Sequence, residues 1–395
     1  MLQEAPPRAQ RPKVLLIAGI VVILLFAGAV GLLKIGADGY YVLSPGQAPV
    51  VTASQQCRAA GGGSFSLPGG KPCVQLVVPP GRAHGTTGTI MMVDVYEGKP
   101  NPLQYLIYKL GWQKTFENHV QFVPNKNIIG NGTPEQLNCN NTQQAMQATS
   151  AAPVAALRRL GYTVKEEDVG AQLDAVLPGT PASAAGLQCN DLVTAVNGAP
   201  VRSAQDIGAS IKPLAPGTEV HLTVIRSTAQ GSSRTLVLTA RLSGTPARAG
   251  LAANPNKPFL GVESETRTKY DFPFPVSANV GSIGGPSDGL ALALGFIDTL
   301  DQGRLTGGLA VAATGTIDPD GNVGEIGGAA QKAVAVRNAG AKVFLVPKGN
   351  YAEAKSEAGS MKVFAVSSLN QALADLQSLG GQVPAPTAHA TAVTE

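Results

Sequence analysis

The segment Val14–Leu33 constrains this chain more than any other, because it is a long apolar run without a charged residue. Its length is what an α-helix needs to cross a hydrocarbon core of roughly 30 Å. A buried core helix is the weaker interpretation, since a terminal run with no polar face has nothing to present to water. We therefore expect one transmembrane helix over residues 14–33.

The charges that flank this run predict its orientation. Arg8, Arg11 and Lys13 precede it, whereas Lys34 and Asp38 nearly cancel after it. The excess of positive charge before a spanning helix is typical of the cytoplasmic side. We expect a single-pass protein of the cell membrane, with residues 1–13 cytoplasmic and the bulk of the chain extracytoplasmic.

A cleaved signal peptide is the alternative to a permanent anchor. The small residues Ala27-Gly28-Ala29 would suit a cleavage site, but the apolar run is longer than a usual signal core. Both interpretations place the rest of the chain outside the cytoplasm.

Charge and cysteine usage exclude several classes of function. The net charge is only +4, and no Lys/Arg-rich run with interleaved aromatic residues occurs, so no nucleic acid is expected as a partner. The cysteines show no C-x-x-C spacing, which argues against a zinc site or a redox motif, and we expect no metal and no cofactor. Outside the cytoplasm, a disulfide between Cys57 and Cys73 is expected because both flank a glycine-rich loop. The cysteines are Cys57, Cys73, Cys139 and Cys189.

The length of 395 residues predicts two or three folded units joined by linkers. We expect an α+β multidomain protein. Extended stretches between Pro, Gly and Asn turns predict a β-rich region over residues 40–160 that ends in a helix, which Pro153 would split or kink. A linker rich in Ser, Gly, Pro and Ala covers residues 243–258, and the tail 381–395 reads as disordered.

Residues 164–242 have a distinct rhythm of short strands and two short helical pieces. Gly179 and Gly186 suit turns, and Asn197-Gly198 is a strong hairpin signal. The segment AVLPGTPASAAGLQCNDLVTAVNGAPVRSAQDI resembles a PDZ domain, although Cys189-Asn190 stands where that family usually has Pro-Gly. The resemblance implies a groove that binds an extended peptide as an added strand.

The final unit, residues 259–380, alternates strands and helices as an α/β domain does. A helix that starts near Ser287 is apolar on almost every side and should be central. Ser287 lies between glycines that permit close backbone approach, and free amides at a helix start can stabilise an oxyanion. Its simpler role would be that of an N-cap.

Lys332 is the candidate base in this unit. Small or apolar residues and no carboxylate stand three and four positions away on its helix, which favours a partly buried ammonium group. Burial lowers the pKa of a lysine, and a lysine needs that shift before it can act as a neutral base.

Three motifs in this unit are similar to the proteolytic domain of Lon. They are Gly285-Pro286-Ser287-Asp288-Gly289, Thr314-Gly315-Thr316-Ile317, and Ile326-Gly327-Gly328 followed by Lys332. The resemblance implies a Ser-Lys dyad in which Ser287 is the nucleophile, Lys332 the general base and Thr314 the hydroxyl that orients the amine.

The sequence departs from the Lon pattern in three places. Pro273 and Pro275 stand where many Lon proteases have histidines, and Asp288 replaces a small residue beside the serine. No G-x-x-x-x-G-K-[ST] phosphate loop occurs, so ATP-driven unfolding is not expected. The arrangement looks like the bacterial membrane-anchored PDZ-Lon proteins.

We therefore expect an ATP-independent serine endopeptidase that acts outside the cytoplasm on peptides or unfolded proteins. The resemblance also implies a homo-oligomer. The alternative is a catalytically silent PDZ scaffold or binding protein, which Asp288 and the missing histidines favour.

Overall fold

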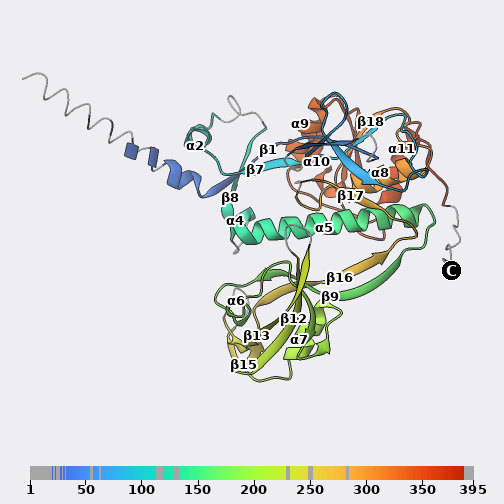
Figure 1. Ribbon diagram of the computed structural model, residues 1–395. Coiled ribbons are helices and arrows are strands. Elements are labelled where there is room, and N and C mark those ends of the chain that lie inside the picture. Colours follow the sequence, from blue (N-terminus) through green and yellow to red (C-terminus); the bar gives the residue numbers. More distant parts are fainter. Residues whose placement is uncertain are drawn as a thin grey trace, which may run out of the picture. The chain divides into compact units, whose positions relative to one another are not determined.

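The computed structural model describes residues 33–386 and a few positions between 20 and 31. Inside that range, residues 54–56, 62–63, 113–118, 129–132, 228–231, 248–251 and 282–283 are not described. The chain divides into two compact units, shown with their elements in Figure 1. The first comprises Met1–Pro45 and Val95–Gly130, and the second comprises Gly46–Asp94 and Asn131–Glu395.

The first unit is built on a small antiparallel sheet. Its strand order is β7-β1-β8, with β1 in the centre. The strands are β1 (Tyr40–Pro45), β7 (Val95–Gly98) and β8 (Gln121–Pro124), and the helices are α2 (Pro102–Lys109) and α4 (Asn125–Ile128). Asn101 caps α2 reciprocally with Gln104, so the helix starts where a Pro at its first position also favours a start.

The second unit contains a seven-stranded mixed sheet of order β17-β5-β2-β6-β18-β21-β22. Its central neighbours β6 and β18 run parallel, as do β18, β21 and β22. The strands are β2 (Val50–Ala53), β5 (Cys73–Val77), β6 (Thr89–Met91), β17 (Ser277–Asn279), β18 (Ala310–Ala313), β21 (Val343–Pro347) and β22 (Lys362–Val366). The helices that accompany it are α5 (Pro134–Arg159), α8 (Gly289–Leu300), α9 (Ala329–Asn338), α10 (Tyr351–Glu357) and α11 (Leu369–Ser378).

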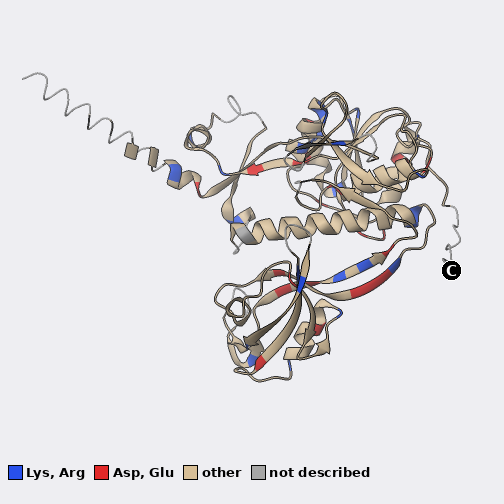
Figure 2. Cartoon of the chain, in the orientation of Figure 1, with Lys and Arg blue, Asp and Glu red and all other residues tan. Residues whose placement is uncertain are grey.

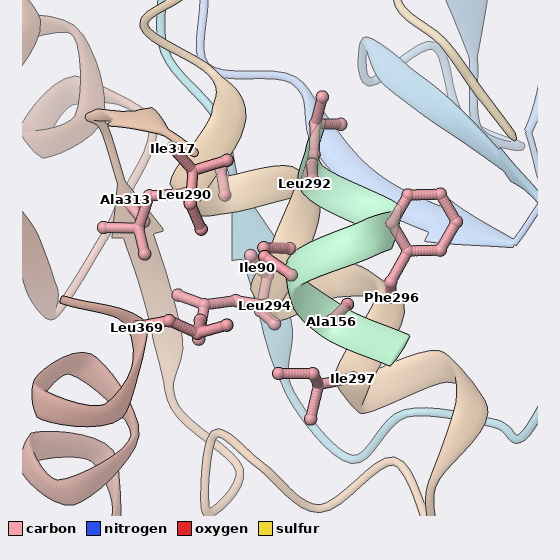
Figure 3. Close-up of a cluster of buried hydrophobic side chains, with 14 of the residues drawn as sticks. Ile90, Ala156, Leu290, Leu292, Leu294, Phe296, Ile297, Ala313, Ile317 and Leu369 are labelled. Atoms are coloured by element: carbon pink, nitrogen blue, oxygen red, sulfur yellow. The ribbon is translucent and has the colours of Figure 1, made fainter. Parts of the chain in front are cut away.

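Helix α8 forms the centre of this unit. Every residue from Gly289 to Thr299 is buried, as its all-round apolar sequence predicts. Figure 3 shows side chains of α8 in one cluster with Ile90 from β6, Ala156 from α5 and Leu369 from α11. The start of α8 is therefore held rigidly from several elements.

The segment of the second unit that resembles a PDZ domain forms a sheet of order β13-β12-β10-β9-β16, with β11 paired to β10, here called the PDZ sheet. Its strands are β9 (Lys165–Val176), β10 (Leu192–Val196), β11 (Ala199–Pro200), β12 (Glu219–Ser227), β13 (Ser233–Arg241) and β16 (Val262–Asp271), and its helices are α6 (Pro181–Ala184) and α7 (Ala204–Ile211). Strand β16 lies at the edge and pairs along its whole length with β9. Opposite charges meet across this pair, for example Lys269 opposite Glu167, as the blue and red segments of Figure 2 show.

Two disulfides hold loops of the second unit. Cys57 and Cys73 are bonded, with Cα atoms 6.0 Å apart, which confirms the pairing expected from the sequence. Cys139 on α5 is bonded to Cys189, which lies between α6 and β10. All four cysteines of the chain are thus paired.

The structure divides residues 40–160 differently from the single β-rich region that we expected. Residues 46–94 supply three strands to the large sheet, and β16 belongs to the PDZ sheet although it follows residue 259. Pairing over long sequence separations, which local patterns do not encode, causes both differences. Pro153 does not interrupt α5, which is one helix.

Two expectations concern the ends of the chain. The expected disordered tail 381–395 is ordered at its start, where the amides of Gly381 and Gln382 donate to Leu376 and Arg304. The expected spanning segment 14–33 lies mostly outside the described residues. Within the described part of the chain, no helix has the length and apolar character that crossing a bilayer requires.

Candidate active site

Ser287 lies in a turn directly before α8. Gly285 has a φ of +93°, a backbone conformation that suits glycine, and it lets the chain turn sharply into the helix. The N-cap of α8 is Asp288 and not Ser287, so the simpler role of a capping serine does not apply. The carbonyl of Ser287 accepts hydrogen bonds from the Gly315 amide at 2.7 Å and from the Thr314 hydroxyl at 3.0 Å. The turn is thereby fixed to the end of β18.

Lys332 lies in the first turn of α9 and is 2% exposed. Its Nζ donates a hydrogen bond to Thr314 Oγ1 at 3.1 Å. The sequence predicted a partly buried ammonium group, and the structure buries the side chain almost completely. Burial lowers the pKa of Lys332 to about 8, because a charged amine is costly away from water.

Thr314 joins the other two candidates. It follows β18, is fully buried, and its hydroxyl donates to the Ser287 carbonyl while it accepts from Lys332 Nζ. One hydroxyl carries one donor and two acceptor sites, so both bonds are compatible. The structure therefore brings together Ser287, Thr314 and Lys332, the three residues singled out in the sequence.

Two carboxylates act on Lys332, and both raise its pKa against the effect of burial. Asp288 is 3% exposed, and its Oδ1 has no hydrogen-bond partner among the described residues. Burial raises the pKa of Asp288 to about 7, with Asp94 adding to the rise and Lys332 opposing it. Burial likewise raises the pKa of Asp94, whose Oδ1 accepts the Gln47 amide at 2.5 Å.

Sequence reasoning treated Asp288 only as a departure and missed Asp94. The available signal was Asp94, a charged residue directly after the strand-like stretch Thr89–Val93. A carboxylate at a strand end would raise the pKa of a buried lysine beside it. Lys332 lies 238 residues after Asp94, and nothing in the sequence alone relates the two positions.

The start of α8 also supplies backbone donors. The Leu290 amide donates to the Gly315 carbonyl at 3.1 Å, and the Gly289 amide makes a long bond of 3.4 Å to Pro286. Within the described part of the chain, no hydrogen bond occupies the amides of Ser287 and Asp288. Free amides at the start of a helix suit an oxyanion, since the helix dipole adds to their attraction.

A groove of about 520 Å³ reaches Gly284, the residue before this turn. One wall is α5 and the other is β17 with the residues that follow it. β17 pairs with β5 on one side and stands at the edge of the large sheet, and α5 contacts it. The lining residues are Asn138, Asn141, Thr142, Ala145, Met146, Thr149, Ala278, Asn279, Val280, Gly281 and Gly284.

The PDZ sheet also presents an edge strand. Helix α7 packs against β9 and β16, and the Ala204 amide at the start of α7 donates to Thr266 Oγ1 at 3.1 Å. Gly261, which precedes β16, has a φ of +93° and lies against Thr180, where a Cβ would clash. Strand β16 is followed within six residues by β17, which lines the groove.

Comparisons with protein families agree with both the PDZ sheet and the site around Ser287. Residues 173–226 match the PDZ domain family, and residues 247–376 match the Lon protease (S16) C-terminal proteolytic domain. The chain is a serine peptidase. More narrowly, it has the domains of a PDZ-containing Lon-like protease, as the sequence indicated.

Solved structures similar to the chain include the PDZ domains of the SdrC-like proteins from Listeria monocytogenes and Listeria innocua. Each is 18% identical, covers 24% of this chain and has a TM-score of 0.19, and the matches span 87% and 92% of those chains respectively. No curated protein matches the chain in sequence.

Proposed function

We propose that this protein is a membrane-anchored, ATP-independent serine endopeptidase that uses Ser287 and Lys332 as a catalytic dyad. The observation that carries the proposal is the burial of Lys332, whose amine bonds to the Thr314 hydroxyl beside the Ser287 turn. A buried amine with a pKa of about 8 is neutral in roughly one molecule in eleven at pH 7, and in more at higher pH. A neutral amine can accept the serine proton.

The proposed reaction proceeds through an acyl-enzyme. Lys332 takes the proton of Ser287 Oγ as the oxygen attacks the peptide carbonyl, and the amides of Ser287 and Asp288 receive the developing oxyanion. The ammonium group of Lys332 then protonates the departing amine. Water, deprotonated by the same lysine, hydrolyses the ester and releases the free serine.

The proposed substrates are peptides or unfolded segments of proteins. An extended peptide placed along the edge of β17 would gain main-chain hydrogen bonds and lie in the groove that Gly284 lines, three residues before Ser287. The open side of β16, beside α7, is the proposed place of peptide capture by the PDZ domain. Both sites favour substrates that are already extended, which agrees with the absence of a phosphate-loop motif from the sequence.

The proposed location is the outer side of a cell membrane, with residues 14–33 as the anchor. The two disulfides support it, because structural disulfides persist in oxidising compartments. A homo-oligomer remains part of the proposal from the resemblance to Lon.

The test is cleavage of an unfolded protein substrate by the full chain, compared with Ser287→Ala and Lys332→Ala variants. We expect cleavage only by the unaltered chain. Equal cleavage by all three would refute the dyad. Absence of cleavage by the unaltered chain between neutral and alkaline pH would favour the silent scaffold, because Asp288 and Asp94 both raise the pKa of Lys332 and so oppose its action as a base.

A further inference from the structure

Helix α2 of the first unit carries apolar side chains on two opposite faces. One face is aromatic and packs on the small sheet of that unit. Tyr108 stacks on Phe122 with ring centroids 4.4 Å apart, and Tyr40 lies 5.7 Å from Tyr105 and 5.5 Å from Tyr108. This face accounts for how α2 is held in its unit.

The other face of α2 is aliphatic. Leu103, Ile107 and Leu110 follow the spacing i, i+4, i+7, which places them in one line along a helix. At about 100° per residue, Tyr105 and Tyr108 point away from that line. Leu103 is 64% exposed, Leu110 is 48% exposed, and none of the described residues of α2 is buried.

A tryptophan follows the end of α2. Gly111 has a φ of +70° and its amide donates to Tyr108, while the Trp112 amide donates to the Ile107 carbonyl at 3.0 Å. This pair of bonds is a Schellman motif, in which the residue after the glycine commonly contacts the one whose carbonyl it bonds. Trp112 is 53% exposed. We call Leu103, Ile107, Leu110 and Trp112 the α2 apolar face.

The position of α2 indicates what covers this face. Gly36 lies so close to Tyr105 that a Cβ added there would stand 2.5 Å from the ring. Residues 33–37 are helical, so Gly36 lies about 4.5 Å along the axis beyond Leu33, the end of the proposed anchor. The headgroup layer is about 5–7 Å thick on each side of a bilayer. Helix α2 is therefore held at the level of the headgroups.

The composition of the unit suits that environment. Trp and Tyr concentrate at membrane interfaces, where lysines extend toward the headgroups. Lys109 Nζ lies 5.4 Å from the centre of the Tyr105 ring, and Lys99 Nζ lies 3.9 Å from that of Tyr41. In residues 34–45 and 95–130 the lysines outnumber the carboxylates, which favours an anionic surface. The lysines are Lys34, Lys99, Lys109, Lys114 and Lys126, and the carboxylates are Asp38, Glu97 and Glu117.

We propose that the α2 apolar face docks on the phospholipid surface, so that its residues lie among the headgroups beside the anchor. This inference rests on the proposed membrane anchor. It adds that the first unit is fixed on the lipid surface and is not a flexible tether. This fixed position would limit the distance from the membrane at which the protein binds substrate. The competing occupant of the face is a second copy of the chain.

Trp112 is the only tryptophan of the chain, so the intact protein carries its own probe. The full chain is reconstituted into vesicles of phosphatidylethanolamine and phosphatidylglycerol that contain a phospholipid brominated either near the glycerol or near the end of its acyl chains. We expect tryptophan emission to be quenched by the shallow bromines, to be affected less by the deep ones, and to be protected from iodide present on both sides.

Vesicle flotation, measured on the same samples, separates the two proposals. A chain that does not float overturns the anchor and with it the docking. A chain that floats, with Trp112 open to iodide and unaffected by bromine, overturns the docking alone. Protection from iodide that depends on protein density and not on bromine assigns the face to a second copy, and also overturns it.

The variant that tests the face combines Leu103→Glu with Leu110→Glu, two exposed positions whose change leaves the aromatic face intact. We expect it to float, to lose most of the bromine quenching and to gain iodide access. The control is Val237→Glu on β13, because Val237 is 65% exposed and lies in the PDZ sheet. Quenching of the control should equal that of the unaltered chain, and equal loss in both variants would contradict the assignment.

Discussion

Replacing Asp288 with Asn tests how the site sets the protonation of Lys332. The carboxylate of Asp288 raises the pKa of Lys332, while burial lowers it to a net value of about 8. Because burial raises the pKa of Asp288 to about 7, this carboxyl group is mostly ionised at the pH where Lys332 titrates. The Asn side chain has nearly the same shape and no charge. We therefore expect the pKa of Lys332 to fall in the variant.

The magnitude follows from the charge interaction. A carboxylate close to an amine shifts its pKa by about 1–3 units, and we take about 1 unit because Asp94 remains. At pH 7, a lysine with a pKa of about 8 is neutral in roughly one molecule in eleven, and one with a pKa of about 7 in roughly one in two. The acid limb of kcat/KM should move about 1 unit lower, and kcat/KM at pH 7 should rise about five-fold.

The assay is kcat/KM for an unfolded protein or a fluorogenic peptide across the range from about pH 5 to pH 10. Asp288→Ala, which also removes the charge, serves as the second variant because a buried amide could perturb the turn. Asp375→Asn is the matched control, since Asp375 lies on α11 and its raised pKa is caused by burial and not by Lys332. An acid limb that stays in place in both Asp288 variants would refute the electrostatic reasoning, whatever their maximal rates.

Three further predictions concern the neighbouring structure. Thr314→Val should lower kcat about 10–100-fold while Thr314→Ser keeps most activity, because only the hydroxyl bonds Lys332; the rates are compared at the pH optimum. Burial raises the pKa of Asp298 to about 6, so the native state retains a proton that the unfolded chain loses above about pH 4. The free energy of unfolding should thus fall by up to ~3 kcal/mol as the pH rises from about 4 to about 6. Urea unfolding of Asp298→Asn should show a smaller dependence on pH over this range. Loss of the Cys139–Cys189 disulfide, which spans 50 residues, should lower the free energy of unfolding by about 4 kcal/mol. Loss of Cys57–Cys73, which spans 16, should lower it by about 3 kcal/mol. Urea unfolding of the paired Cys→Ser variants measures both.

Much of the second unit could be predicted from short patterns. The all-apolar stretch after Ser287 predicted the buried helix α8, and the small residues around Lys332 predicted its burial. The glycine-rich turns and the Asn197-Gly198 hairpin likewise predicted the PDZ strands. In each case a few neighbouring residues determine the local backbone, so the information lies in one short segment.

The remaining features depend on pairing between distant segments. The burial of Asp288 at 3% exposure requires the packing around α8, which a single Asp in a turn does not disclose. The Cys139–Cys189 bond requires that α5 approach the loop before β10. The edge position of β16 requires its pairing with β9, almost 100 residues earlier, and so the expected linker boundary did not separate the two domains.

The region between the proposed anchor and the PDZ domain, which had no predicted role, contributes to the candidate active site through strand direction. β6 and β18 are parallel neighbours, with Met91 opposite Ala312. Parallel strands that end together deliver the residues after them to the same edge of the sheet, and ligands of open α/β sheets bind at that edge. Asp94 follows β6, and Thr314 follows β18, which explains why the carboxylate of Asp94 acts on Lys332. The strands from residues 46–94 are therefore part of the proteolytic fold, and a fragment that begins at residue 259 would lack both the central strand β6 and one of the two carboxylates that set the base.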